Sequence, residues 1–415
     1  MKEFSDFLNK YKSSAETENL VIFGAGTLGR LTLIALNEKG IKVNLFCDSD
    51  VRKQGKNIEK IKIIGPEELE KLDKNSNIFI CAIYFSSIVP MLEKKGFKSL
   101  YKSTELLEQL DVNKYYKKVV IEGNGYLEPL KLKRDIDFYN EMGRKNDYIS
   151  NGQLNVKSID VQITEKCSLK CKDCSNLMQY YKKPVDSDYD LLVNSMDKIM
   201  SSVDFIDELR VLGGDPFMNK ELNKIINKLV TYKNVGRIVV YTNARFIPKN
   251  QNLDYLKQPR VILDITDYGE ASAAAGKYVE FAKKEGIAYS INSCNTWQDC
   301  GRIIPNNKKT EKELEHQFNN CCNSDLVSLL HGKLYRCPFS ANGVNLKAFA
   351  SIKDDEINLS DNSIGKKELR DKIMHLSFGK KYLAACRFCN GRDYATANIP
   401  SAIQTKSKLD YKFQN

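Results

Sequence analysis

Three cysteines within eight residues form the sharpest chemical motif of the sequence. Cys167, Cys171 and Cys174 follow the apolar segment 159–164 with the spacing Cys-x3-Cys-x2-Cys. Three thiolates in one loop can bind a 4Fe–4S cube and leave its fourth iron open to another ligand. A structural zinc site needs four protein ligands, and all three histidines lie beyond residue 315. The pattern therefore favours an iron–sulfur cluster over zinc.

The elements that must position this loop alternate between strand-like and helix-like segments. Strands are predicted at 159–164, 208–212, 237–241, 261–265 and 289–292, with amphipathic helices between them. Polar residues follow each strand, including Gly213–Pro216, Thr242–Asn243 and Asp267–Tyr268. The carboxyl ends of parallel strands meet at one edge, so we expect these residues to lie near the cysteine loop.

The sequence CSLKCKDC resembles the signature of the radical S-adenosylmethionine (SAM) superfamily, and the resemblance covers about residues 155–395. It implies a partial (β/α)6 barrel of the TIM type, with a 4Fe–4S cluster on Cys167, Cys171 and Cys174. It also implies a SAM site, made by Gly213, Gly214, Asp215, Pro216, Thr242 and Asn243. Two positions depart from the usual pattern: Asp173 stands where an aromatic residue is common, and Asp215 replaces a glutamate.

A second group of cysteines lies downstream, at Cys321-Cys322, Gly332-x4-Cys337 and Cys386-x2-Cys389. The group resembles the Twitch domain, the shortened form of SPASM, which holds one auxiliary 4Fe–4S cluster. The resemblance assigns the cluster to Cys321, Cys337, Cys386 and Cys389, with Cys322 as the alternative to Cys321. A zinc site with the same four thiolates is the competing interpretation.

Candidate catalytic residues follow the last two predicted strands. Cys294 and Cys300 belong to neither cysteine group, and each is either a hydrogen-atom donor or an inert buried thiol. Asp267 and Tyr268 are candidates for a general base. Glu270 and Arg302 are further candidates for that role, and Asp264 is a candidate ligand of SAM or substrate.

The N-terminal region has a different motif. A strand at 20–23 runs into GAGTLG, a helix that ends at Gly40, a strand at 41–46 and the acidic sequence CDSD. This order is typical of a dinucleotide-binding βαβ unit, with Gly24, Gly26 and Gly29 near a phosphate and Asp48 near a ribose. The region also resembles the Rossmann-like N-terminal domain of sugar acyltransferases, which implies a nucleotide-linked sugar. The competing interpretation is a domain that keeps the glycine turn for packing and binds nothing.

We therefore expect an α/β protein with several domains in its 415 residues. A Rossmann-like, doubly wound nucleotide-binding domain is predicted at 1–112 and a linker at 113–155. The radical SAM core follows at 156–309, a small Fe–S domain at 310–395 and a tail at 396–415. Little helical periodicity is evident between 310 and 366.

The predicted function is a radical SAM oxidoreductase that dehydrogenates a nucleotide-linked sugar. Its cofactors would be SAM and two 4Fe–4S clusters, one of which accepts the substrate electron. An epimerase with a cysteine hydrogen donor, a peptide maturase and a non-enzymatic nucleotide-sugar-binding protein are the alternatives. We expect a cytoplasmic protein with a flavodoxin or ferredoxin as electron donor. The modest net charge of +11 is spread along the chain, and we expect neither nucleic-acid binding nor a membrane span.

Overall fold

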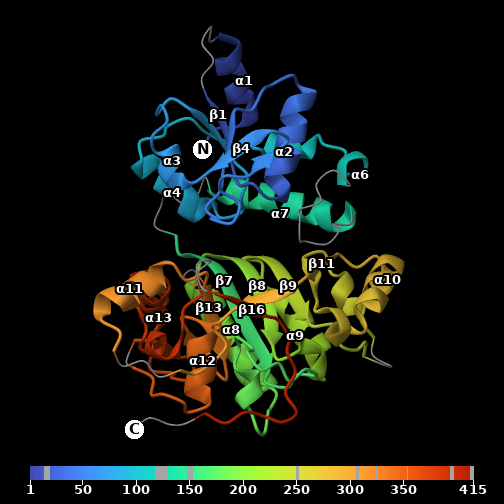
Figure 1. Cartoon of the computed structure of the whole chain (residues 1–415), viewed down its shortest axis with the longest axis vertical. Coiled ribbons are helices and arrows are strands. Elements are labelled where there is room, and N and C mark those ends of the chain that lie inside the picture. Colours follow the sequence, from blue (N-terminus) through green and yellow to red (C-terminus); the bar gives the residue numbers. More distant parts are fainter. Residues whose placement is uncertain are drawn as a thin grey trace. The chain divides into compact units, whose positions relative to one another are not determined.

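The computed structural model describes residues 1–13, 19–116, 129–146, 153–248, 252–304, 308–323, 326–352, 354–392 and 397–411. It divides into two compact units, Met1–Gln153 and Leu154–Asn415, drawn in blue to teal and in green to red (Figure 1). The second unit contains the predicted core, Fe–S domain and tail together. The predicted boundary at 395/396 lies outside the described residues. No helix in the described ranges is long and apolar enough to cross a bilayer.

The first unit is built on a six-stranded sheet of order β3-β4-β2-β1-β5-β6. Its strands are β1 (Leu20–Phe23), β2 (Leu45–Cys47), β3 (Asn57–Ile58), β4 (Ile61–Ile64), β5 (Asn77–Ile80) and β6 (Leu100–Lys102). All neighbours except β3 and β4 pair in parallel. Numbered in chain order, the five parallel strands are arranged 3-2-1-4-5. The chain first adds strands on one side of β1 and then on the other, so the topological switch point lies between β1 and β5.

The helices of this unit are α1 (Phe4–Ser13), α2 (Thr27–Glu38), α3 (Pro66–Leu69), α4 (Phe85–Lys94), α5 (Thr104–Glu108), α6 (Val112–Tyr115) and α7 (Pro129–Asn146). α7 lies within the predicted linker and instead packs on the first unit. Its Tyr139 is fully buried, donates to the Ile80 carbonyl and accepts from the Ser103 N–H. The charged residues of α7 separate apolar positions that nevertheless keep helical spacing, at Leu132, Ile136 and Tyr139.

The second unit holds an eight-stranded sheet of order β11-β10-β9-β8-β7-β13-β14-β15. Its strands are β7 (Asn155–Thr164), β8 (Phe205–Gly213), β9 (Val235–Thr242), β10 (Val261–Asp267), β11 (Tyr289–Ser293), β13 (Leu326–Leu330), β14 (Lys333–Tyr335) and β15 (Glu356–Asn358). The first six strands of this order are parallel, and β14 and β15 are antiparallel. The five predicted strands are therefore consecutive neighbours, and their carboxyl ends share one edge.

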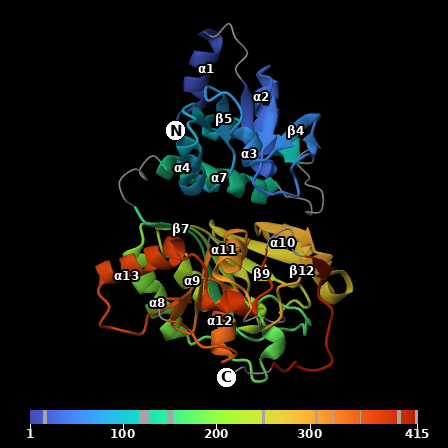
Figure 2. The same cartoon turned by 60° about the vertical axis from the view of Figure 1, so that its left-hand side comes forward.

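One face of this sheet carries the main hydrophobic core. Alternate residues such as Ile159, Leu209 and Leu263 are fully buried against helices. These helices are α8 (Tyr189–Ser202), α9 (Leu222–Leu229), α10 (Ala275–Glu285) and α13 (Lys366–Met374). α13 packs beside α8, although 163 residues lie between the end of α8 and the start of α13 (Figure 2). The core fixes the sheet, and so fixes the positions of the loops that follow its strands.

The opposite face of the sheet is polar. Its residues include Ser158, Asp160, Gln162, Glu208, Arg210, Arg237, Tyr241, Asp264, Ser290 and Asn292. Asp160 and Arg210 are register partners and form an ion pair with Nε and Oδ1 3.4 Å apart. Asp264 accepts hydrogen bonds from Ser290 Oγ and Asn292 Nδ2 at 2.7 and 3.1 Å. Because strand side chains alternate between faces, this polar row is the counterpart of the apolar core.

The region after residue 310 contains more helix than its sequence pattern predicts. α11 (Glu311–Asn319) begins with a capping box of Thr310 and Glu313, and α12 (Pro338–Asn345) begins with a proline. Both start signals are visible in the sequence, although apolar periodicity is weak there. The predicted Gly332 turn connects β13 and β14, with His331 and Gly332 both at positive φ. Beyond it, β16 (Asn398–Pro400) pairs with β12 (Thr296–Gln298) (Figure 2).

Candidate functional site

The loop of the first cysteine group starts at the carboxyl end of β7 and is fastened to the end of β8. Gly214 N–H donates to the Thr164 carbonyl and Asp215 N–H to the Lys166 carbonyl, both at 2.8 Å. A Cβ atom on Gly214 would lie 2.0 Å from the Lys166 carbonyl oxygen and 3.0 Å from the Cys167 nitrogen. Glycine is therefore required here because two backbone segments are in contact.

The carboxylate of Asp215 links the ends of β8 and β9. It is buried and accepts hydrogen bonds from Phe217 N–H, Thr242 Oγ and Asn243 N–H at 3.0–3.1 Å. Burial raises its pKa, and the three donors oppose that shift. The motif residues Gly213 to Pro216 and Thr242–Asn243 thus form one connected structure beside the cysteine loop, in which the Asp215 side chain acts as a connector.

The three cysteines of this loop share one small cluster. Cys167 and Cys174 pack around Leu169, Cys171 and Ala402, together with Tyr268 and Trp297. The Asn243 carboxamide donates to Cys167 Sγ at 3.4 Å, and the Gln404 carboxamide donates to Cys171 Sγ at 3.2 Å. Burial raises the pKa of all three thiols, that of Cys171 to about 12. Iron binding must therefore displace thiol protons.

The donor set of this loop fits a 4Fe–4S cluster with one open iron. Three free thiols lie in a confined loop, and amide groups stand ready to hydrogen-bond their sulfur atoms. Among the side chains that the structure describes, no three Cys, His, Asp or Glu residues converge as ligands of a single metal ion. A cube binds each thiolate through a different iron, so its cysteines surround a larger object than one ion.

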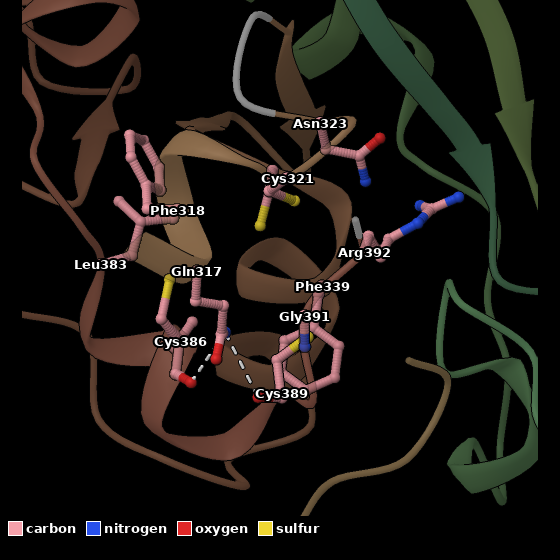
Figure 3. A pocket seen from close by; sticks show the side chains of 12 residues that line it. Gln317, Phe318, Cys321, Asn323, Phe339, Leu383, Cys386, Cys389, Gly391 and Arg392 are labelled. Carbon is pink, nitrogen blue, oxygen red and sulfur yellow. Dashed lines mark hydrogen bonds between the residues drawn. The ribbon is translucent and has the colours of Figure 1, made fainter. Parts of the chain in front are cut away.

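The second cysteine group surrounds a separate pocket of about 450 Å³, counted out to its opening (Figure 3). Cys321, Cys337, Cys386 and Cys389 all line it. The structure thus brings together the four residues that the sequence analysis selected, and Cys322 does not line this pocket. Its remaining lining is mostly apolar, with Phe318, Phe339, Leu383 and Ala385.

Two side chains hold the Cys386–Cys389 segment in position. Gln317 Nε2 of α11 donates to the carbonyls of Cys386 and Cys389 at 3.2 and 3.3 Å (Figure 3). Lys309 Nζ donates to the same two carbonyls at 3.3 and 2.6 Å. Burial raises the pKa of Cys386 to about 11 and that of Cys337 to about 12. Four thiols in an apolar pocket can bind a metal ion or cluster as thiolates, and binding would release their protons.

Arg392 connects this pocket with the polar face of the sheet. It lines the pocket, and its guanidinium points away from the sulfur atoms toward the neighbouring strands (Figure 3). It interacts electrostatically with Cys300, Cys321 and Cys322, and its charge opposes the raised pKa of Asp160. Cys300 is buried on this side, so the structure separates it from Cys294, with which the sequence analysis had grouped it.

The remaining catalytic candidates lie near the first cysteine loop. Tyr268 stacks edge-on against Trp297 with ring centroids 5.5 Å apart, and burial raises its pKa. Cys294 is partly buried, and its charge and those of Cys171 and Cys174 add to that shift. The Asp267 carboxylate accepts from Gly269 N–H at 2.8 Å and so caps its own turn. Tyr268 therefore packs in the same cluster as the three cysteines, and Cys294 lies beside Tyr268.

In the first unit, the glycine motif and Asp48 form one hydrogen-bonded turn. Asp48 accepts from Ala25 N–H at 2.8 Å and from Lys53 Nζ at 2.9 Å. A Cβ on Gly24 would lie 2.7 Å from the Cys81 carbonyl oxygen, and one on Gly29 would lie 1.9 Å from the Gly24 oxygen. Gly24 and Gly29 therefore serve packing. No neighbour lies within 4 Å of a Cβ on Gly26, which leaves the backbone there open to a ligand.

Two features of the second unit were not predicted from the sequence: the polar face of the sheet, of which only Asp264 was named as a candidate, and the position of Gln404. The polar face of the sheet could have been found, because Ser158, Asp160 and Gln162 alternate with buried apolar residues along β7. Gln404 carries no comparable signal. It lies 233 residues after Cys171, in a segment without periodicity, and only the fold brings the two together.

Residues 160–284 match the family described as a 4Fe-4S single cluster domain. This range contains Cys167, Cys171 and Cys174 and ends before the second cysteine group. Residues 160–284 are therefore similar to a domain that binds a single 4Fe–4S cluster.

Curated relatives of this chain include the GTP 3′,8-cyclase of Campylobacter jejuni subsp. jejuni serotype O:6. It is 24% identical over 161 residues, which make up 37% of this chain and 45% of the relative. The enzyme of the same name from Clostridium acetobutylicum is 24% identical over 115 residues, 26% of this chain and 35% of the relative. The chain thus spans less than half the length of these relatives.

Similar solved structures include BtrN in complex with AdoMet and 2-DOIA, at 20% identity and a TM-score of 0.38. It covers 62% of this chain and 98% of BtrN. Streptococcus suis SuiB bound to S-adenosylmethionine matches at 10% identity and a TM-score of 0.30. It covers 73% of this chain and 85% of SuiB.

Proposed function

We propose that this protein is a radical SAM oxidoreductase that dehydrogenates a carbohydrate, and that the carbohydrate is a nucleotide-linked sugar. The second cysteine group would hold an auxiliary 4Fe–4S cluster, and the first unit would hold the nucleotide. The single observation that carries the proposal is the pocket lined by Cys321, Cys337, Cys386 and Cys389. Four thiolates would leave that cluster no open iron, which suits an electron acceptor better than a substrate ligand.

The electron balance of dehydrogenation explains why two metal groups are needed. Oxidation of a carbinol to a ketone removes one hydrogen atom, one proton and one electron from the substrate. When bound, SAM and the first cluster supply the radical that takes the hydrogen atom, and the auxiliary cluster supplies the acceptor for the electron. The hydroxyl proton passes to a base of the protein or to water.

The chain's own residues would orient the substrate and exclude water. The polar face carries carboxylates, guanidinium groups and amides that can hydrogen-bond several hydroxyl groups, among them Asp264 and Asn292. Asp160 is buried, and burial raises its pKa, which makes its carboxylate a stronger proton acceptor than an exposed aspartate. Arg392 lies between Asp160 and the auxiliary pocket and would stabilise negative charge developing there.

Anaerobic reconstitution followed by product analysis tests this proposal. We expect about eight irons per chain, release of 5′-deoxyadenosine under reduction, and a keto product from a panel of nucleotide-linked sugars. Cys389→Ala should keep SAM cleavage but lose the keto product, because the electron has no acceptor. Cys47→Ala, a buried thiol of the first unit, is the matched control and should lose neither. About four irons with bound zinc would refute the acceptor role.

Epimerisation is a second candidate function because of Cys294. This thiol is partly buried and lies beside Tyr268, close to the first cysteine loop. It could return a hydrogen atom to the substrate radical and be reduced again through the auxiliary cluster. In D2O, an epimerase would place deuterium on the inverted carbon, and Cys294→Ala would abolish that incorporation. A keto product without deuterium exchange would favour dehydrogenation.

A further inference from the structure

The segment Ser401–Tyr411, here called the strap, crosses directly over the first cysteine loop. Lys172 N–H donates to the Ile403 carbonyl at 2.7 Å, and Thr405 N–H donates to the Lys170 carbonyl at 2.8 Å. These bonds flank an antiparallel bridge between Cys171 and Gln404. The strap is therefore paired with the loop through its backbone, in the manner of a short added strand.

Further contacts fasten both ends of the strap. Ser401 N–H donates to the Asn295 carbonyl at 3.1 Å, and β16 just before it pairs with β12. At the other end, Lys408 Nζ donates to the Met178 carbonyl and Leu409 N–H to the Gln179 carbonyl, both at 2.9 Å. The strap is anchored before, across and after the cysteine loop, so its position over Cys171 is fixed.

Gln404 uses both halves of its carboxamide at this crossing. Its Oε1 accepts from Lys170 N–H at 2.7 Å, and its Nε2 donates to Cys171 Sγ at 3.2 Å. The acceptor bond fixes the orientation of the amide, so the donor is held toward the sulfur. Neighbouring Ala402 is buried against Cys171 at a φ of +52°, a conformation that costs free energy for a residue other than glycine. The surrounding contacts stabilise that conformation.

We propose that the strap is part of the radical SAM cluster site and that Gln404 is a positioning residue that raises the reduction potential of the cluster. A hydrogen bond to a ligating sulfur stabilises the more negative, reduced state of an iron–sulfur cluster. Asn243 makes the corresponding bond to Cys167, from β9 on another side of the loop. The inference rests on the proposed cluster at Cys167, Cys171 and Cys174, and it adds a residue that lies outside the matched family range.

The variant Gln404→Glu separates the donor from the acceptor. Glutamate keeps an oxygen for Lys170 N–H and removes the amide that donates to Cys171 Sγ and to the Ala402 carbonyl. Gln404→Leu removes both, and Ser407→Ala, a neutral change at an exposed position of the strap, is the control. The readout is an anaerobic redox titration followed by EPR, restricted to the signal that changes when SAM is added. That restriction separates the first cluster from the auxiliary one.

We expect both Gln404 variants to lower the midpoint potential, while iron content and melting temperature stay at wild-type values. At the wild-type midpoint, the ratio of reduced to oxidised cluster should fall roughly fivefold, which corresponds to about 1 kcal/mol. An unchanged midpoint in both variants with full iron content overturns the role of Gln404. Absence of a SAM-responsive signal in the wild-type protein would overturn the proposed function itself, before any variant is compared.

Discussion

Gly214 offers a quantitative test of how the cysteine loop is positioned. In the variant Gly214→Ala, the new Cβ would lie 2.0 Å from the Lys166 carbonyl oxygen, whereas ordinary contact begins at 3.4 Å. The backbone before Cys167 must therefore retreat by about 1.4 Å, because a carbonyl cannot move aside as a flexible side chain can. A displacement of about 1 Å at a reacting centre lowers rates by about 100-fold. The overlap should also cost roughly 1–3 kcal/mol of folding free energy.

The assay is the initial rate of 5′-deoxyadenosine release after anaerobic reconstitution, with iron content and melting temperature measured on the same samples. Gly276→Ala is the matched control, because this residue lies in α10 and a Cβ there has no neighbour within 4 Å. We expect a rate loss of about 100-fold in Gly214→Ala and a normal rate in Gly276→Ala. A Gly214→Ala protein that releases 5′-deoxyadenosine at the wild-type rate would refute the positioning argument.

Three further predictions concern the first unit. Burial raises the pKa of Cys81 from 9.0 to about 11, so between pH 9 and 11 the folded state keeps a proton that the unfolded state releases. The free energy of unfolding should therefore fall across this range by up to about 3 kcal/mol. Denaturant melts of Cys81→Ala should lack this fall. Equal falls in the wild-type protein and the variant would contradict the assignment to Cys81. Gly29→Ala should destabilise the unit by roughly 1–3 kcal/mol. Gly26→Trp should leave the stability of the unit unchanged and weaken nucleotide-sugar binding measured by calorimetry. An unchanged affinity would argue against a nucleotide site at Gly26.

The parts of the fold that could be predicted are those with strong local patterns. The strand predicted at 20–23 matches the structure residue for residue, because its short apolar run leads directly into a glycine-rich turn. α7 was predicted only as some helix within a linker, since charged residues separate its apolar stripe at Leu132, Ile136 and Tyr139. α11 and α12 were missed because their apolar periodicity is weak. Their start signals, a capping box in α11 and an early proline in α12, are visible in the sequence.

The same distinction holds for the candidate site: residues with a local motif were predicted, and residues placed by long-range contacts were not. The resemblance to the Twitch domain selected four thiols that line one pocket, with Cys322 as the alternative to Cys321. Spacing could not separate Cys300 from Cys294, since the chain turns sharply between them and β12 intervenes. Gln404 and Arg392 depend on contacts between segments that are distant in sequence, and no local pattern carries that information.

The crossing of the strap over the cysteine loop also has a consequence for biosynthesis. Gln404 leaves the ribosome 233 residues after Cys171. At about 5–20 residues per second, the nascent loop spends roughly 10–50 s without its cover. During that interval Cys171 lacks the backbone bridge and the side-chain contacts that the strap makes with it. Cluster delivery that precedes release of the strap would meet an open loop, whereas later delivery would have to displace the strap or wait for it to open.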